Sequence, residues 1–353
     1  MLAICIECSH QRGMGHLFRA LNLIHYLDEA GMDRLLLVNE DQAAERILRE
    51  RDIPYLTVDL WDMQSGWERT IIENYQVTAW LNDRLDTVGA TAQHVKETGI
   101  PLYTIDDMGE GAALADGNFA SLVFEDIDLI PGRKVYAGPD YLILNPEIRT
   151  YRRQRTDLRK ILVTLGGSDT YGVTTAVIES LKRLLQSTGT DEESGSGAET
   201  EHRHARGPLQ PEVTVLLGPA AVNRSEVEAA LAGTGFGLIS SVPSLIQSFA
   251  EYDLAITGGG VTCLEAAASG LPCVIIANEL HEIPIGSYVE RIGGGMFAGY
   301  YQDMNLDCIK PLLNEKQSGM EQERIRNMSR NGMERVSLEG ASRICRVIQG
   351  EAK

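Results

Sequence analysis

The stretch Arg12-Gly-Met-Gly-His-Leu-Phe-Arg19 decides the fold of this chain. It follows an apolar run, Leu2–Ile6, that predicts a buried first strand, and it leads into apolar residues at helical spacing. A glycine turn therefore carries His16 from the carboxyl end of a strand to the amino end of a helix. Backbone N–H groups and the helix dipole favour an anion there, and a histidine changes charge near neutral pH. The pattern predicts chemistry on a phosphorylated ligand.

The rest of the chain repeats this strand–helix alternation in two series. The first series has apolar strands at 35–38, 55–58, 77–81, 102–105, 120–124 and 141–144. The second starts with 160–165 and continues at 213–217, 236–239, 254–257 and 273–276. Such alternation is typical of βαβ units around a parallel sheet. We therefore predict an α/β chain with two Rossmann-like lobes and a ligand crevice between them, at the carboxyl ends of the strands.

The domain boundaries follow from shifts in composition. The first lobe is predicted at 1–148, and a strongly basic segment with little apolar periodicity, 149–159, reads as a linker. The second lobe is predicted at 160–325, and a helix in 326–353 is expected to pack back across the lobes. Within the second lobe, 187–208 is rich in Ser, Gly, Glu, Thr and His, which predicts a mobile insertion.

Bulk properties exclude several classes of protein. The chain has 353 residues, 43% hydrophobic and 23% charged, as expected of a soluble protein of two domains. Its net charge of −18 argues against binding nucleic acid or anionic lipid. No apolar run is long enough for stable membrane insertion and no signal peptide is recognisable, so we expect a cytoplasmic protein. Cys5 and Cys8 resemble half a zinc site without a second pair, and no metal is expected.

The strongest local signal is Thr257-Gly-Gly-Gly-Val-Thr-Cys-Leu-Glu265. A strand runs into three glycines and then a helix, which leaves the amino terminus of the helix open to a diphosphate. Three glycines exceed what a turn requires. Glu265 lies one turn inside, where its carboxylate would accept hydrogen bonds from ribose hydroxyls; the alternative is a surface charge that suits the helix dipole.

A second glycine turn, Leu165-Gly-Gly-Ser-Asp169, ends the first strand of the second lobe. Gly167 allows close backbone approach, and Ser168 adds a hydroxyl to an anion cradle. The alternative is a tight βα turn in which Asp169 caps the following helix.

Acidic residues also follow two strands of the first lobe. Asp83 lies in Asn82-Asp-Arg-Leu-Asp-Thr87, and Asp106 and Asp107 follow Ile105. Such residues position a water or hold sugar hydroxyls, or they cap the next helix. Around the place where a dinucleotide fingerprint has its third glycine, this chain has Leu17-Phe-Arg19. The long Arg19 disfavours a dinucleotide and suits a phosphate contact.

Together these segments resemble the UDP-sugar hydrolases of the pseudaminic-acid pathway and the related spore coat polysaccharide biosynthesis proteins, which are close to the MurG-like glycosyltransferases. The resemblance runs nearly end to end and implies a GT-B fold. It implies that the first lobe lies on the sugar and catalytic side, where His16 activates water at the anomeric carbon with Arg19 beside it. It also implies that the second lobe holds the uridine diphosphate with the turn at 258–262 and Glu265.

The predicted site residues fall into three groups, and no cofactor is expected. His16 and Arg19 are predicted to be catalytic. The predicted substrate-binding residues are Gly13, Gly15, Asp83, Asp106, Asp107, Gly167, Ser168 and Asp169. The predicted nucleotide-binding residues are Gly258, Gly259, Gly260, Val261, Thr262 and Glu265.

One segment departs from the family pattern. Where the family usually has an Asn-Gln pair near the nucleotide and the sugar, this chain has Asn278-Glu-Leu-His-Glu282. Acidic residues near a diphosphate weaken or redirect its binding.

The sequence favours a hydrolase that releases UDP and a deoxyamino sugar for nonulosonic-acid or surface-polysaccharide biosynthesis. A glycosyltransferase that passes the same sugar to an acceptor is the alternative. A MurG-like enzyme acting on lipid would need an apolar, basic patch, and the first lobe shows none in its sequence. A non-catalytic nucleotide-sugar binding protein is a third candidate, against which His16 and Arg19 argue.

Overall fold

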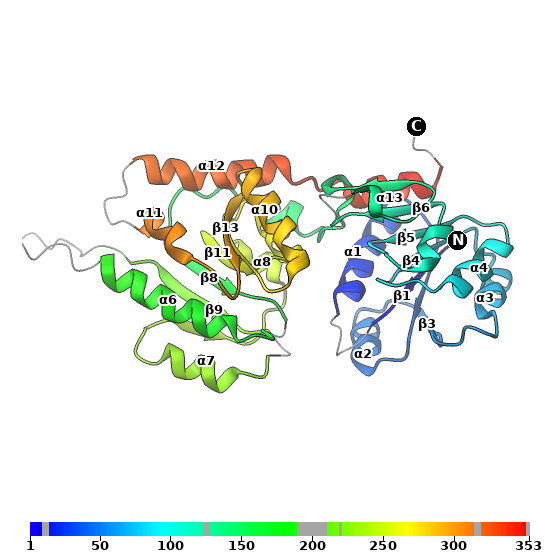
Figure 1. The fold of residues 1–353 in the computed structure, drawn as a ribbon, viewed down its shortest axis with the longest axis horizontal. Coiled ribbons are helices and arrows are strands. Elements are labelled where there is room, and N and C mark those ends of the chain that lie inside the picture. Colours follow the sequence, from blue (N-terminus) through cyan, green and yellow to red (C-terminus); the bar gives the residue numbers. More distant parts are fainter. Residues whose placement is uncertain are drawn as a thin grey trace, which may run out of the picture. The chain divides into compact units, whose positions relative to one another are not determined.

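The computed structural model describes residues 1–8, 14–122, 127–167, 169–188, 210–218, 221–313 and 319–350. The chain divides into two compact units, shown with their elements in Figure 1. Unit 1 comprises Met1–Pro146 and Ser337–Lys353, and unit 2 comprises Glu147–Val336. The first unit is therefore built from both ends of the chain.

Unit 1 is a seven-stranded parallel sheet in the order β3-β2-β1-β4-β5-β6-β7. The strands are β1 (Leu2–Ile6), β2 (Arg34–Val38), β3 (Tyr55–Thr57), β4 (Ala79–Asp83), β5 (Leu102–Ile105), β6 (Gly117–Ala120) and β7 (Val135–Ala137). The α-helices are α1 (Gly15–Glu29), α2 (Gln42–Glu50), α3 (Trp67–Tyr75), α4 (Gly89–Glu97) and α13 (Gly340–Ile348), with short 3₁₀ helices η1 (Glu110–Leu114), η2 (Ile127–Leu129) and η3 (Pro139–Tyr141).

Both faces of the unit 1 sheet are covered, which explains why every residue of β1 is buried. One face packs against α1, α2 and α13, where Leu17 and Ile344 are completely buried. The other packs against α3 and α4 around Trp80. The carboxyl-terminal helix α13 lies beside α1 (Figure 1).

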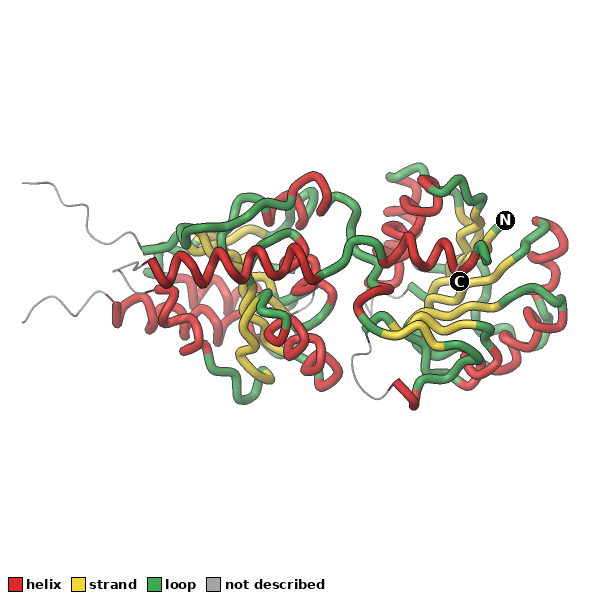
Figure 2. The backbone as a smooth tube through the Cα atoms, turned by 90° about the horizontal axis from the view of Figure 1, so that it is seen from above, coloured by secondary structure: helices red, strands yellow, loops and turns green. Residues whose placement is uncertain are grey.

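Unit 2 is a six-stranded parallel sheet in the order β10-β9-β8-β11-β12-β13. The strands are β8 (Lys160–Thr164), β9 (Glu212–Leu216), β10 (Gly237–Ile239), β11 (Leu254–Gly258), β12 (Cys273–Ala277) and β13 (Gly295–Tyr300). The helices are α5 (Ile148–Tyr151), α6 (Val173–Thr188), α7 (Arg224–Leu231), α8 (Leu245–Phe249), α9 (Val261–Ala268), η4 (Leu280–Glu282), α10 (Ile283–Arg291), η5 (Leu306–Ile309), α11 (Lys310–Leu313) and α12 (Gly319–Arg335). In each unit the strands lie between helices (Figure 2).

The predicted α/β fold with two parallel-sheet lobes is confirmed. The strand expected at 141–144 is wrong, because Gly138 (φ 91°) and Pro139 turn the chain into η3 and the sheet ends at β7 instead. The apolar run at 141–144 packs against α13 and does not pair with a strand. The two segments lie so close that a side chain on Gly340, the first residue of α13, would overlap the backbone of Leu142. The strand expected at 120–124 lies at 117–120, and 123–126 fall outside the described residues.

The segment expected to link the lobes, 149–159, is an integral part of unit 2. Arg155 in this segment is completely buried. Its guanidinium donates to the backbone carbonyl oxygens of Arg153 (2.7 Å), Phe249 (2.5 Å) and Tyr252 (3.2 Å), and also to that of Ser269. The basic composition of this segment suggests a linker. Arg155, however, is a buried cation that donates hydrogen bonds to loop carbonyls.

The helical region expected at 326–353 is divided between the two units, since α12 belongs to unit 2 and α13 to unit 1. Most of the insertion expected at 187–208 lies outside the described residues; α6 itself continues to Thr188.

Arg155→Ala is expected to lower the free energy of unfolding of unit 2 by about 3 kcal/mol, because it leaves several buried carbonyls without donors. Arg159→Ala is the matched control: its side chain is 76% exposed, and a change below about 0.5 kcal/mol is expected. Urea unfolding followed by circular dichroism measures both. Equal effects of the two variants would contradict the structural role of Arg155.

Candidate active site

Three neighbouring strand ends bring polar side chains together in unit 1. β1, β4 and β5 are adjacent and parallel, so their carboxyl ends meet at one edge. Asp83 is the last residue of β4, and Asp106 directly follows β5. α1 starts after β1 and presents His16 and Arg19 three residues apart, on one face of its first turns.

His16 and Asp83 form the central contact of this site. The Nδ1 atom of His16 lies 2.6 Å from Oδ1 of Asp83, and the aspartate is 1% exposed. Burial would raise the pKa of Asp83, but the charge of Arg19 and the hydrogen bonds from His16 and Arg19 outweigh it and lower the pKa. Asp83 is therefore an ionised acceptor, and Nδ1 of a neutral His16 carries the proton that it donates.

This assignment leaves the lone pair of the neutral His16 ring on Nε2. The histidine side chain is 20% exposed, and no hydrogen bond to Nε2 is formed within the described part of the chain. Nη2 of Arg19 lies 3.3 Å from Nδ1 of His16. Both nitrogens are donors in this assignment, and both donate to Oδ1 of Asp83 rather than to each other. The ring thus has one nitrogen anchored and one able to accept a proton.

Arg19 is held by two carboxylates. Its Nε donates to Asp83 Oδ2 at 2.9 Å, its Nη2 donates to Asp83 Oδ1, and its Nη1 donates to Asp106 Oδ2 at 2.5 Å. Burial would lower the pKa of the guanidinium, but the charges of Asp83 and Asp106 raise it. The side chain is 13% exposed. Instead of projecting a free charge toward a phosphate, Arg19 orients Asp83 and, through it, His16.

Asp106 and Asp107 have different surroundings. Asp106 has a left-handed backbone (φ 47°) and also accepts from Ser121 Oγ at 3.0 Å and from the Leu122 N–H at 3.0 Å. Such backbone strain is found at functional sites. Asp107 is completely buried and accepts from the N–H groups of Thr87 (3.0 Å) and Gly109 (2.9 Å).

Asp107 is therefore occupied in joining two loops, and burial raises its pKa. Its complete burial leaves it no surface for the substrate that the sequence predicts it to bind.

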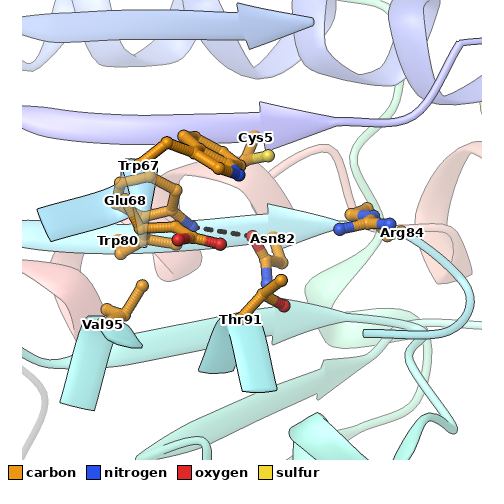
Figure 3. A pocket seen from close by; sticks show the side chains of 8 residues that line it. All are labelled: Cys5, Trp67, Glu68, Trp80, Asn82, Arg84, Thr91 and Val95. Carbon is orange, nitrogen blue, oxygen red and sulfur yellow. Dashed lines mark hydrogen bonds between the residues drawn. The ribbon is translucent and has the colours of Figure 1, made fainter. Parts of the chain in front are cut away.

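A polar cavity lies on the opposite face of β4, between the sheet and α3 and α4 (Figure 3). Its volume is about 10 Å³, room for no more than one water. It is lined by Cys5, Trp67, Glu68, Trp80, Asn82, Arg84, Thr91 and Val95. Burial raises the pKa of the Cys5 thiol to about 12, so this thiol is inert. The cavity is too small for a sugar and is separate from His16.

The glycine turn of unit 2 follows β11 and opens α9. Gly260 is the N-cap of α9 and provides no side-chain cap, so the first N–H groups of the helix have no partner within it. Two of the three glycines have a packing reason as well. A Cβ on Gly259 would lie 2.7 Å from Cβ of Glu282, and one on Gly258 would lie 3.0 Å from Nδ2 of Asn278. Glu265 lies in the second turn of α9 and is half-buried.

The other predicted ligand positions divide into open and occupied ones. Among the described residues, no atom lies within 4 Å of a Cβ built on Gly15 or Gly167, which suits close approach of a ligand. Asp169 is 7% exposed and accepts from the Thr174 N–H at 3.2 Å and from Asn223 Nδ2 at 2.6 Å, so it caps the start of α6. Gly13 and Ser168 lie outside the described residues.

Glu279 and Glu282 lie in segment 278–282, which departs from the family pattern. The sequence does not indicate the contacts that they make. Glu282 Oε2 accepts from the N–H groups of Asn278 (2.7 Å) and Gly259 (3.3 Å). Glu279 is exposed and accepts from the Tyr171 hydroxyl at 2.7 Å. Only Glu282 of these two contacts the glycine turn, and no sequence signal separates one from the other.

Known structures share this architecture. MurG from Acinetobacter baumannii is 15% identical with a TM-score of 0.67, and the match covers 99% of each chain. The UDP-GlcNAc 2-epimerase from Neisseria meningitidis, solved bound to UDP-GlcNAc, is 13% identical with a TM-score of 0.60 over 100% of both chains. The chain has the GT-B fold.

Sequence comparison gives relatives at somewhat higher identity. No family model matches this GT-B chain. The spore coat polysaccharide biosynthesis protein SpsG of Bacillus subtilis is 23% identical over 292 residues, which is 80% of this chain and 78% of SpsG. The uncharacterized protein MJ1062 of Methanocaldococcus jannaschii is 22% identical over 315 residues, 82% of this chain but only 58% of that protein. The predicted resemblance to spore coat polysaccharide biosynthesis proteins is confirmed at this level of identity. Among the described residues, no helix has the length and apolarity needed to cross a membrane.

Asp83→Asn is expected to destabilise unit 1 by about 3 kcal/mol at pH 7, because Arg19 loses its main counter-charge in a buried site. The folded pKa of Asp83 is lowered, so its stabilisation is present above the unfolded value of about 4 and is lost as the pH falls through the lower folded value. The difference from wild type therefore shrinks on acidification.

Tryptophan fluorescence during urea unfolding at pH 7 and pH 3.5 measures this, since Trp61, Trp67 and Trp80 all lie in unit 1. Asp86→Asn, at an exposed aspartate in the loop that follows β4, serves as the control with an expected change below about 0.5 kcal/mol. A difference that stays constant between the two pH values would argue against an ionised Asp83 in the fold.

Proposed function

We propose that this protein is a nucleotide-sugar hydrolase. It cleaves a UDP-linked deoxyamino sugar at the anomeric carbon and releases UDP, in nonulosonic-acid or surface-polysaccharide biosynthesis. The observation that carries the proposal is the His16 ring, anchored through Nδ1 to Asp83 at 2.6 Å with Nε2 left to accept a proton. The similarity to SpsG, named for spore coat polysaccharide biosynthesis, and the fold shared with UDP-GlcNAc-bound and UDP-bound proteins support it.

The proposed reaction uses the anchored His16 ring as a general base. A water molecule attacks the anomeric carbon while His16 Nε2 takes one of its protons. The bond between that carbon and the diphosphate oxygen breaks, and its electron pair leaves with UDP. Asp83 stabilises the imidazolium that forms, as a buried carboxylate does in other acid–base pairs. The proton then passes to solvent, which leaves UDP and a free sugar.

In the proposed reaction, UDP is the leaving group and is bound by unit 2. Negative charge builds up on the departing diphosphate, and the uncapped N–H groups at the start of α9 are suited to stabilise it. Glu265 is the proposed partner of the ribose hydroxyls. Gly15 and Gly167 remain proposed ligand contacts because no described residue fills the space where their side chains would be.

The remaining polar residues have supporting tasks in the proposal. Arg19, placed between two carboxylates, is a positioning residue that keeps Asp83 ionised and directed at His16. Asp106 holds the far side of the Arg19 guanidinium.

A glycosyltransferase is the second candidate, favoured by the structural similarity to MurG and to the glycosyltransferase from Rickettsia africae, with TM-scores of 0.67 and 0.65. The same base would then take its proton from an acceptor hydroxyl in place of water. The two functions differ only in which hydroxyl reaches the anomeric carbon.

His16→Gln is expected to reduce UDP release from a UDP-deoxyamino sugar about 10²- to 10⁴-fold, the usual contribution of a general base. His25→Gln is the matched control: it lies on the same helix, its side chain is 49% exposed, and its contact is with Glu29 on the surface. The measurement is UDP formed per unit time from a panel of UDP-sugars, each with and without candidate acceptors.

The outcomes separate the candidates. Release of UDP in water alone, lost in His16→Gln and kept in His25→Gln, supports the hydrolase. Release that requires an acceptor favours the glycosyltransferase. Full activity of His16→Gln would remove this residue from the mechanism.

A further inference from the structure

A carboxylate already lies against the glycine turn of unit 2. Glu282 Oε2 accepts from the N–H groups of Asn278 at 2.7 Å and Gly259 at 3.3 Å. A Cβ built on Gly260, the N-cap of α9, would lie 3.5 Å from the other oxygen, Oε1. Both carboxylate oxygens therefore face the turn that precedes the open N–H groups of α9.

Within the part of the chain that the structure describes, the carboxylate of Glu282 has no basic partner. No ion pair within 4.0 Å joins it to a lysine, arginine or histidine in the described ranges. The neighbouring acid, Glu279, is engaged differently, because its Oε1 accepts from the Tyr171 hydroxyl at 2.7 Å. Of the two, only Glu282 brings a charge to the turn.

The hydrogen bonds of Glu282 do not by themselves require a charge. A neutral amide at this position would also accept from the Asn278 N–H. The negative charge has a separate consequence, since it repels any further anion that binds beside it at the start of α9.

We propose that Glu282 lowers the affinity of the glycine turn for UDP and thereby promotes release of UDP after cleavage. This inference rests on the proposed function. A UDP-sugar carries two negative charges on its diphosphate. Free UDP carries about three at neutral pH, since the second ionisation of a terminal phosphate has a pKa of about 6. A fixed carboxylate therefore opposes the product more strongly than the substrate, which makes Glu282 a residue that distinguishes the two.

The test compares Glu282→Gln with wild type by isothermal titration calorimetry. The ligands are UDP and the β-methyl ester of UDP, which keeps the base and the diphosphate but lacks the third charge. Glu282→Gln is expected to lower the Kd for UDP about tenfold and that for the methyl ester only about fivefold, because the ester carries two of the three charges. Glu279→Gln removes the same charge three residues away, and a change below about threefold is expected because its carboxylate contacts Tyr171 and not the turn.

Each outcome decides the proposal. A UDP affinity that is unchanged or weaker in Glu282→Gln would overturn it, as would an equal gain for UDP and its methyl ester. An equal gain in Glu279→Gln would show a general effect of net charge and would also overturn it. Failure of UDP to bind either wild type or Glu282→Gln, with both folded by circular dichroism, would instead reject the proposed function together with this inference.

Discussion

The ion pair between Arg19 and Asp83 is the interaction on which the site in unit 1 depends. It fastens the first turns of α1 to the end of β4 in a buried position, where a charge without a partner would be costly. The pair keeps Asp83 ionised, and an ionised Asp83 fixes which nitrogen of His16 carries the proton. The orientation of the His16 side chain and its tautomer thus both depend on this ion pair.

The two units use the same sheet architecture for different electrostatic purposes. At the strand ends of unit 1, Arg19 pairs with Asp83 and Asp106, and His16, also anchored to Asp83, is partly accessible. At the strand ends of unit 2, the start of α9 presents backbone N–H groups without a side-chain cap. The first arrangement suits proton transfer and the second suits an anion. Glu282 adds a negative charge of its own to the second.

A glycine at a strand end of this chain either makes room for a neighbouring side chain or leaves space for a ligand. The residue type alone does not separate these two explanations. Asn278 and Glu282 pack against Gly258 and Gly259, whereas no residue that the structure describes fills the space beside Gly15. Counting glycines therefore overstates the case for ligand contact at the turn after β11. The same difficulty affects Asp107 and Asp169, whose oxygens are used by nearby loops and a helix start. A polar residue at a strand end serves the fold as readily as it serves a ligand.

The sequence by itself determined the α/β class, the two parallel sheets and the position of His16 at a strand–helix junction, because burial pattern and glycine turns are local properties of the chain. It did not determine which carboxylate meets which cation. Arg19 is 64 residues from Asp83 and 87 from Asp106, and these groups meet only when β1, β4 and β5 become neighbours in the sheet. It also did not reveal that Arg155, in a segment with the composition of a linker, is buried among backbone carbonyls. Only the tertiary structure decides such pairings, because they depend on strand order and side-chain direction rather than on spacing along the chain.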